Sequence, residues 1–490
     1  MSSKANADYE KVVNSLKSRC RGGFKNLKGA TAADICAVTA LPLSTVREFL
    51  PKAADEYSGH LRVTESGEIL YHFPNGFKSV YRGLGASLKK AAEKFAYYFK
   101  KTLAFLFKVW IMVMLIGYFL LFIAIAIAAV VISIASRSEG KDRRGGFGGF
   151  YLFDLLIRLW LYSDLTRRDY NYNYGRAKKE NKRPMHKAIF SFVFGEDDPN
   201  RNWDEQLNKS LISFLLANKG VISLPEYMVF SGEDSLEAEK SILALCSKYS
   251  GSPEATEDGT IVYRFDEIFL RSDSVNNNEQ LVGLQQLKKF SSNSKTMNVA
   301  FILINAVNMI FGSYFLYQAF AAGQLITQLD YASASKMYAY THLFLDYVMP
   351  IPQDFIGIVL GFIPLVFSIF FWVIPLIRFN LEKKDNEKIK LKNFKRFSFN
   401  NIWVTLKKIR LENLRPPSRE CCPKDLYAAA DRVIKDIGAI STPQVEIDEN
   451  GKTIYSFNEL EREKIALNKY RSSVDLSKLQ IGNTVFDSNN

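Results

Sequence analysis

Three consecutive carboxylates, Glu196, Asp197 and Asp198, could do metal chemistry in this chain. They lie in the segment SFVFGEDDPN, residues 191–200. Clustered carboxylate oxygens suit hard cations such as Ca²⁺ or Mg²⁺. The same residues also fit an acidic turn that follows a helix end and stops at Pro199. The sequence favours the turn, and the cation site is the alternative.

The sulfur and imidazole side chains form no metal-ligand pattern. The four histidines are scattered, and the cysteines make no CxxC pair. Two adjacent cysteines cannot easily coordinate one tetrahedral zinc ion. We therefore interpret the thiols as reduced, in a cytoplasmic setting, and predict no metal and no cofactor. The cysteines are Cys20, Cys36, Cys246, Cys421 and Cys422.

The chain also lacks the motifs of common enzymes. A glycine-rich stretch, RRGGFGGF at residues 143–150, does not contain the GxxxxGK[ST] pattern of a phosphate-binding loop. We find no nucleophile–base pair and no nucleotide loop. The sequence therefore predicts a protein that is not an enzyme, with no catalytic and no cofactor-binding residue.

Long apolar runs are the strongest structural signal. Residues 109–135 carry no charge and are almost all Val, Ile, Leu, Met, Phe or Ala, and residues 298–321 and 355–377 are also uncharged. A bilayer core needs about 20 apolar residues in a helix. The sequence therefore predicts an integral membrane protein with α-helical spans at 298–321 and 355–377 and a first membrane segment at 103–135. Because the start, MSSKANADYEK, has no apolar region, we expect the bacterial cytoplasmic (inner) membrane.

The net charge of +13 lies mostly beside these runs. Cytoplasmic flanks are rich in Lys and Arg, so the acidic loop at 322–354 is predicted outside and every other flank inside. Both flanks of segment 103–135 then face the cytoplasm. A re-entrant hairpin that bends near Gly117 and Tyr118 is slightly favoured over one tilted span. We expect anionic lipid headgroups to bind the basic flank, which consists of Lys89, Lys90, Lys94, Lys100, Lys101, Arg143 and Arg144.

An internal repeat occurs three times outside the apolar runs. The three copies of the repeat begin at Val63, Ala255 and Ile447 and read VTESGEILYHF, ATEDGTIVYRF and IDENGKTIYSF. Each has an acidic residue, a glycine and an alternating strand that ends in Tyr-x-Phe, which predicts a β-hairpin. The turn glycines are Gly67, Gly259 and Gly451, and the strand aromatics are Tyr71, Phe73, Tyr263, Phe265, Tyr455 and Phe457.

Short amphipathic helices precede each hairpin. In the first copy, residues 31–40 are followed by residues 44–57, for which Ser44 is a suitable N-cap. Helix, turn, helix and hairpin is the order of a winged-helix domain. The predicted domains are winged-helix-like domains at 1–82, 187–272 and, partial, 421–475. Three basic segments connect these domains and the membrane segments. They are a juxtamembrane helix at 83–102, a Gly/Tyr-rich linker at 136–186 with an interfacial helix at 151–163, and a cytoplasmic helix or linker at 378–420. The fold class is therefore α+β, multidomain and membrane-integral.

Three segments of the chain together resemble one protein family. They are the basic linker RRGGFGGF, the segment KAIFSFVFGEDDPN (residues 187–200) and the hairpin GSPEATEDGTIVYRF (residues 251–265). It is a group of uncharacterised membrane proteins of cyanobacteria and chloroplasts that share these three features in this order. The resemblance covers most of residues 30–460 and is looser in the C-terminal half. Some members carry an iron–sulfur-assembly label, which the cysteine pattern here does not support.

Charge decides between two functions. The second predicted helix of the first copy offers Arg47 and Lys52 but also Glu48, and the second copy is more acidic. Acidic faces repel nucleic-acid phosphates. We therefore expect a membrane-anchored scaffold or assembly protein whose winged-helix-like domains bind unknown protein partners, one of which could be a second copy of this chain. The alternative is a membrane-tethered nucleic-acid-binding protein.

Overall fold

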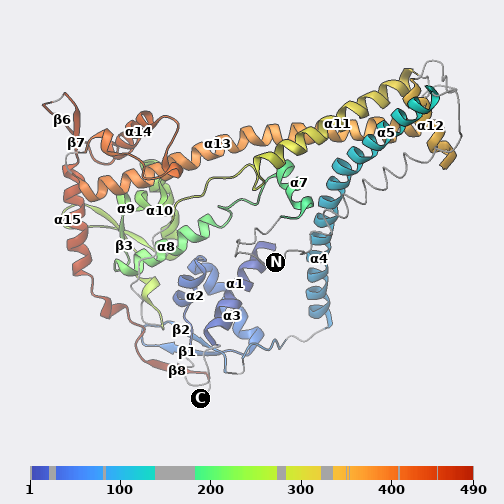
Figure 1. Ribbon diagram of the computed structural model, residues 1–490. Coiled ribbons are helices and arrows are strands. Elements are labelled where there is room, and N and C mark those ends of the chain that lie inside the picture. Colours follow the sequence, from blue (N-terminus) through green and yellow to red (C-terminus); the bar gives the residue numbers. More distant parts are fainter. Residues whose placement is uncertain are drawn as a thin grey trace, which may run out of the picture. The chain divides into compact units, whose positions relative to one another are not determined.

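The computed structural model describes residues 3–20, 29–74, 76–80, 84–137, 183–272, 283–321, 335–348, 350–352, 354–406, 409–449 and 451–488. The chain is mostly helical and contains small β-sheets (Figure 1). It divides into two compact units. The repeat unit contains residues 1–91, 198–288 and 384–490, and the helical unit contains residues 92–197 and 289–383.

The first segment of the repeat unit is built from three helices and a hairpin. They are α1 (Ser3–Cys20), α2 (Ala32–Thr39), α3 (Leu43–Tyr57), β1 (His60–Thr64) and β2 (Ile69–His72). The sequence prediction of Ser44 as an N-cap is wrong, because α3 begins one residue earlier and Pro42 occupies the cap position. A strand from the C-terminal region, β8 (Thr484–Asp487), pairs with β1 and completes a three-stranded sheet in the order β2-β1-β8.

The second segment has the same element order with its own third strand. It contains α8 (Trp203–Ala217), β3 (Val221–Ser223), α9 (Leu224–Ser231), α10 (Ser235–Tyr249), β4 (Ser252–Ala255), β5 (Ile261–Arg264) and the 3₁₀ turn η2 (Glu267–Phe269). The strand order is β3-β5-β4, and every pair is antiparallel.

The third segment is shorter. It contains the 3₁₀ turns η4 (Leu411–Asn413) and η5 (Arg419–Cys421), helix α14 (Leu426–Gly438) and the hairpin β6 (Gln444–Ile447) and β7 (Thr453–Ser456). Helix α15 (Asn458–Ser473) and the 3₁₀ turn η6 (Leu476–Leu479) follow.

One tyrosine of each hairpin makes the same pairing. Tyr71 is bridged to Ala30, Tyr263 pairs with Ile222, and Tyr455 is bridged to Ile409, in each case antiparallel. Each partner residue precedes the short helices or turns of its own segment. The three segments therefore share a backbone pairing that comes before the hairpin, which is a strand (β3) in the second segment and an isolated bridge in the first and third.

The turn glycines and the hairpin phenylalanines also recur. Gly67, Gly259 and Gly451 have φ values of +79°, +78° and +72°, a region that residues with a Cβ adopt at a cost. Phe73, Phe265 and Phe457 are almost fully buried and belong to one hydrophobic core that contains side chains of all three segments.

The first long helix of the helical unit is continuous. It consists of α4 (Leu84–Met112), the π-helical turn η1 (Val113–Gly117) and α5 (Tyr118–Arg137) (Figure 1). The hairpin bend predicted near Gly117 and Tyr118 is therefore wrong, since both sides of this position are right-handed helix. A bend inside lipid would leave backbone N–H and C=O groups without partners, whereas a widened helical turn keeps them paired.

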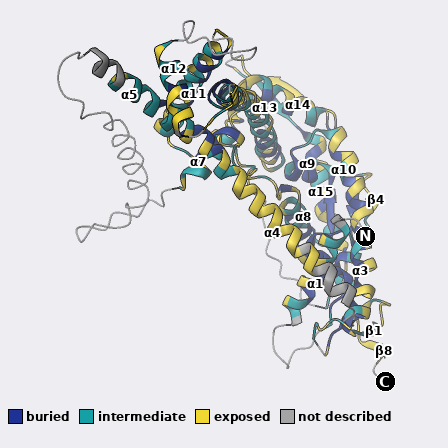
Figure 2. Cartoon of the chain, turned by 90° about the vertical axis from the view of Figure 1, so that its right-hand side faces the viewer, coloured by how far each residue is buried: buried dark blue, intermediate teal, exposed yellow. Residues whose placement is uncertain are grey.

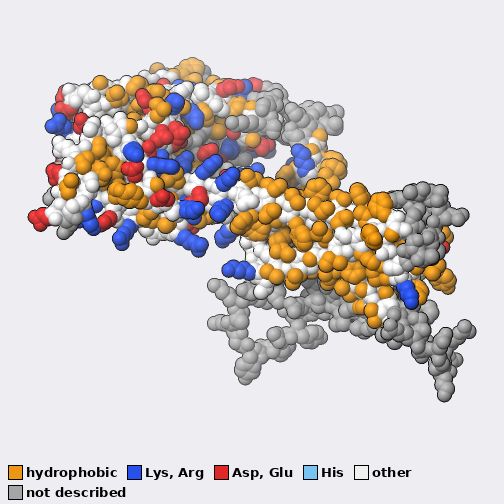
Figure 3. Space-filling view, turned by 90° about the horizontal axis from the view of Figure 1, so that it is seen from above, with side chains coloured by type: hydrophobic (Ala, Val, Ile, Leu, Met, Phe, Trp, Pro, Cys, Tyr) orange, Lys and Arg blue, Asp and Glu red, His pale blue; other side chains and the backbone are white. Residues whose placement is uncertain are grey.

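The remaining elements of the helical unit are α7 (Met185–Phe194), α11 (Lys295–Ala321), α12 (Lys336–Val348), the π-helical segment η3 (Ile356–Phe362) and α13 (Ile363–Thr405). Helix α13 continues into the repeat unit, whose boundary follows Lys383. Much of α4 is exposed (Figure 2), and hydrophobic side chains cover most of the visible face of the helical unit (Figure 3).

Small and polar residues join α11 to its neighbours. A Cβ on Gly361 would lie 2.8 Å from the backbone nitrogen of Leu316, so the two backbones approach closely there. The amide of Asn305 donates to the carbonyl of Ser368 (3.0 Å), and that of Asn308 donates to the carbonyl of Leu115 in η1 (2.7 Å). Both asparagines are fully buried. Such contacts are typical of helices that pack in membranes.

By length and composition, three helical stretches of the described chain could cross a membrane. They are Lys94–Val131, Lys295–Ala321 and Ile356–Thr405.

Candidate functional site

The acidic segment predicted from the sequence is a helix end held by basic partners. Helix α7 stops at Phe194, and Gly195 has a φ of +91°. The guanidinium of Arg183 donates to both carboxylate oxygens of Glu196, one of them at 2.7 Å. The hydroxyl of Ser191 and the backbone N–H of Ser292 also donate to this carboxylate.

These contacts determine the charge state and the neighbours of the acidic residues. The hydrogen bonds from Arg183 are the largest influence and hold the pKa of Glu196 well below its usual range. Asp198 accepts from the N–H of Asn200, and its carboxylate lies 3.3 Å from the ammonium of Lys288. Within the described part of the chain, no three His, Cys, Asp or Glu side chains are grouped closely enough to hold a metal ion. Helix α7 therefore ends before the acidic residues, and a turn follows them at Pro199 and Asn200.

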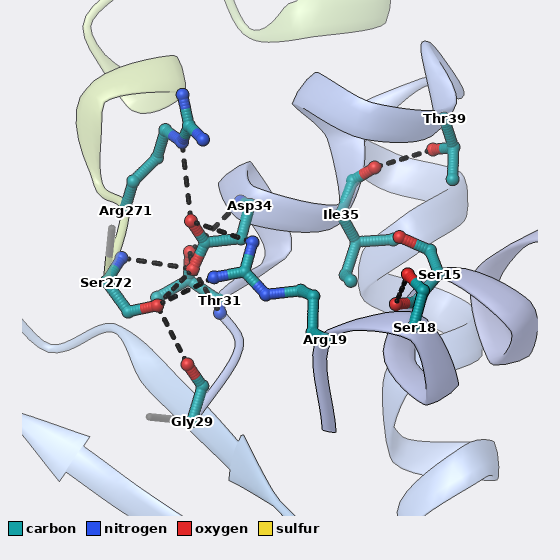
Figure 4. Close-up of polar contacts among 10 residues, drawn as sticks. All are labelled: Ser15, Ser18, Arg19, Gly29, Thr31, Asp34, Ile35, Thr39, Arg271 and Ser272. Carbon is teal, nitrogen blue, oxygen red and sulfur yellow. Dashed lines mark hydrogen bonds and ion pairs between the residues drawn. The ribbon is translucent and has the colours of Figure 1, made fainter. Parts of the chain in front are cut away.

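A buried carboxylate joins the first segment to the second (Figure 4). Asp34 lies on α2 and is fully buried. It belongs to a capping box with Thr31, and its oxygens also accept from the N–H and the hydroxyl of Ser272, at 3.0 and 2.6 Å. Arg19 and Arg271 supply positive charge at 3.5 and 3.3 Å. Burial by itself raises the pKa of Asp34, but Ser272 and Arg19 outweigh it, so this pKa is lowered.

The second segment repeats this arrangement with the third. Residues 30–73 and 222–265 align without a gap, so Glu226 occupies the position of Asp34, in a capping box with Ser223. The guanidinium of Arg471, on α15, donates to both oxygens of Glu226, at 3.0 and 2.6 Å. Here burial outweighs the charge of Arg471 and raises the pKa of Glu226. In both cases an arginine that follows one hairpin binds the capping acid of the preceding segment.

The exposed face of α3 is charge-balanced. Arg47 makes ion pairs with Glu68 at 3.0 Å and with Glu267 at 2.8 Å. Lys52 pairs with Glu48 one turn earlier, at 2.6 Å. In helix-turn-helix proteins the equivalent helix enters the DNA major groove, where free cations meet phosphates. On α3 both of these cations are held by acidic side chains.

The corresponding helices of the other segments expose apolar groups. Leu236 and Leu243 lie two turns apart on α10 and are 61% and 48% exposed, with Glu239 and Lys240 between them also exposed. On α14, Tyr427 is 73% exposed, and Lys435 is paired with Asp431.

The aromatics of the predicted hairpin strands belong mainly to the interior. Tyr71, Tyr263 and the three phenylalanines are buried, and Tyr455 is half-buried. The exposed apolar side chains of the hairpins include Ile69, Ile261 and Ile447. Ile69 and Ile261 each begin the second strand of their hairpin, whereas all four residues of β6, Ile447 among them, are exposed.

The basic flank is only partly within the described residues. Lys94, Lys100 and Lys101 are exposed on α4, and Lys89 and Lys90 lie in the same helix. Arg143, Arg144 and the interfacial helix predicted at 151–163 lie outside the described residues.

Most of the described cysteines are buried free thiols. Cys36, Cys246 and Cys421 are buried and Cys422 is exposed, and each of these four is a free thiol. Burial raises the pKa of Cys36 to about 12, so this thiol is a poor nucleophile.

One curated relative supports the family resemblance at a coarse level. The chain is 24% identical over 393 residues to an uncharacterised chloroplastic protein of Arabidopsis thaliana, which covers 75% of this chain and 69% of the relative. No family model matches the chain, and no solved structure matches it. The chain is thus similar to a chloroplast-type protein over most of its length.

Proposed function

We propose that this chain is a non-enzymatic scaffold or assembly protein, anchored in a membrane by its apolar helices. Its repeat unit presents three winged-helix-like modules to protein partners. The recurrent antiparallel pairing of Tyr71, Tyr263 and Tyr455 with a residue that precedes the hairpin supports a common winged-helix-like topology. The proposed location is the bacterial cytoplasmic membrane with the modules on the cytoplasmic side, because the residues after Arg378 are strongly basic.

The ion pairs of Arg47 carry the choice of a protein partner over nucleic acid. Non-specific DNA affinity comes from cations that neutralise phosphates. Arg47 would have to leave Glu68 and Glu267 before it could bind a phosphate. The exposed leucines of α10 have no role in phosphate binding, but they suit the apolar centre of a protein interface.

Crosslinking in native membranes tests this proposal. We expect full-length chain to capture a protein partner, and Leu236→Asp with Leu243→Asp to lose it. Ile465→Asp is the matched control, because Ile465 is equally exposed but lies on α15. Capture that survives the double change would place the partner on another surface.

A second measurement addresses the nucleic-acid alternative. Full-length chain in uncharged nanodiscs is titrated into labelled duplex DNA across a salt series, and anisotropy is read. We expect no binding tighter than the non-specific range of about 10⁻⁴ to 10⁻⁶ M at physiological salt. Sub-micromolar, sequence-dependent binding would replace the scaffold by the tethered nucleic-acid binder.

A further inference from the structure

The helical unit contains an apolar groove with a volume of about 380 Å³. Its walls come from α4 with η1, from the end of α7, and from η3 with α13. Every lining side chain is apolar, and among them are Phe107, Trp110, Met114, Phe194, Val366 and Phe370. The lining carries no charged side chain, and its one polar side-chain atom is the indole nitrogen of Trp110, so the occupant must be largely apolar there.

The groove opens at its sides to the surface of the unit. Trp110 is 52% exposed and Phe370 is 58% exposed, so the groove is reached laterally. Along η3 and α13 it extends from Phe362 to Ile374. At 1.5 Å per residue this is about 18 Å, close to one leaflet of a hydrocarbon core that is about 30 Å thick. The length suits one acyl chain.

Basic side chains gather at one end of the groove. A shallower hollow on α4 shares Phe107 and Trp110 with the groove and ends at Lys100. The ammonium of Lys108 lies 4.4 Å from the ring centre of Phe190 on α7. Lys100, Lys101 and Lys108 have no acidic partner among the described residues.

The start of α7 adds to this positive end. The ring of His186 lies against Phe105 of α4, and Lys187 follows it on α7. Burial is the main cause that lowers the pKa of His186, and the charges of Lys187 and Lys108 add to it. Neither α7 nor the part of α4 from Lys94 onward contains an acidic residue. This end of the groove therefore complements an anion.

We propose that this groove is a binding site for an anionic phospholipid, with an acyl chain along Trp110 and Phe370 and the phosphate near Lys100 and Lys108. The site goes beyond the scaffold function, and it rests on the proposal that these helices lie in a membrane. An anionic phospholipid meets both features of the groove: its acyl chain fits an apolar channel one leaflet long, and its phosphate fits the cations at one end. A neutral lipid would use only the first of them.

Quenching of Trp110 fluorescence by brominated lipids tests the site. The full chain, with its other tryptophans replaced by Phe, is reconstituted in phosphatidylcholine vesicles that contain a fraction of brominated phosphatidylglycerol or brominated phosphatidylcholine. A basic residue near the membrane surface favours anionic lipid about fivefold. We expect phosphatidylglycerol to quench Trp110 preferentially, and Lys100→Gln with Lys108→Gln to remove the preference.

A pair of matched variants tests the channel itself. Val366→Phe fills the groove and should reduce the preference for phosphatidylglycerol. Val373→Phe adds the same bulk at an exposed position of α13 that does not line the groove, and should leave the preference intact.

The outcomes separate the two proposals. Equal quenching by both brominated lipids in the chain that keeps only Trp110 overturns the groove site but supports membrane insertion. Absence of quenching by either lipid contradicts insertion of this helix. If Val366→Phe leaves the preference for phosphatidylglycerol unchanged, the basic end acts without the groove and the groove site is overturned. If Val366→Phe changes the oligomeric state and no lipid preference is seen, the groove belongs to a contact with a second copy of the chain.

Discussion

Asp34 and Arg271 lie 237 residues apart in the sequence, yet the Nε atom of Arg271 is 3.3 Å from the Oδ1 atom of Asp34. Asp34 is fully buried on α2, and Arg271 follows the hairpin of the second segment. The pair fixes the first segment against the second, as Glu226 and Arg471 fix the second against α15. If the segments are winged-helix-like modules, these acids are the contacts that connect them into one body.

The first prediction concerns Asp34→Asn. This change leaves Arg19 and Arg271 near a neutral group in a buried site, and loss of one partner from a buried ion pair costs about 3 to 5 kcal/mol. We expect a lower urea midpoint for the full chain in detergent, read by labelling of the buried thiol of Cys36. The control is Asp431→Asn, which breaks the exposed pair with Lys435 and should cost no more than about 1 kcal/mol.

Acid should act on the same contact. The pKa of Asp34 is lowered in the folded state, so the stabilisation is complete above the unfolded value of about 3.9 and is lost as the pH falls through the folded pKa. The difference between the unmodified chain and Asp34→Asn should therefore shrink below about pH 4. A difference that stays constant down to pH 2 would show that the charge of Asp34 does not stabilise the unit.

The second prediction has the opposite sign. Burial, followed by the charge of Glu226, raises the pKa of Glu463 to about 7. Between its unfolded pKa and this value the folded state holds a proton that the unfolded chain releases, so stability falls as the pH rises towards 7. Glu463→Gln should raise the melting temperature at pH 8 and have little effect at pH 4. Glu446→Gln, at an exposed position on β6, should change neither.

The third prediction ranks two glycines of the second segment. Gly259 has a φ of +78° and open space around the position of a Cβ, so Gly259→Val should cost about 1 kcal/mol from backbone conformation alone. Gly220 has a φ of +76°, and a Cβ there would lie 2.8 Å from the carbonyl oxygen of Phe265. Gly220→Ala should therefore destabilise the full chain more than Gly259→Val, by denaturant titration. Equal costs would mean that the close approach at Gly220 relaxes freely.

The fourth prediction concerns membrane topology. We predict that the continuous helix through Gly117 crosses the membrane, so that its end at Ser136 lies on the far side from Lys94. Helix α12 packs against the first half of α5. We expect Ser136→Cys and Tyr347→Cys to react with an impermeant thiol reagent from the same side of the membrane. Leu236→Cys and Tyr427→Cys, in the repeat unit, should react from the other side. Labelling of Ser136→Cys together with the repeat unit would restore the re-entrant segment.

Local patterns were sufficient for much of this fold. Apolar length predicted helices at 298–321 and 355–377; α11 contains the first, and η3 together with α13 covers the second from Ile356 onward. The spacing of acidic residue, glycine and Tyr-x-Phe predicted three hairpins, and β1–β2, β4–β5 and β6–β7 lie at those residues. These features depend on neighbouring residues only, because hairpin turns and membrane helices satisfy their own backbone hydrogen bonds.

The relations between distant residues were decided by tertiary structure. Nothing local to TVFD at residues 484–487 indicates that it joins the first hairpin as β8. From the sequence, Arg47 was a basic residue that α3 could offer to a nucleic acid. In the folded chain it is paired with Glu68 and Glu267. The capping acids Asp34 and Glu226 stand three residues after their N-caps, Thr31 and Ser223, but the arginines that bind them come from other segments. Periodicity fixes which side chains are buried, whereas the partner of a buried charge depends on how separate segments pack, and the spacing of residues along the chain does not contain that information.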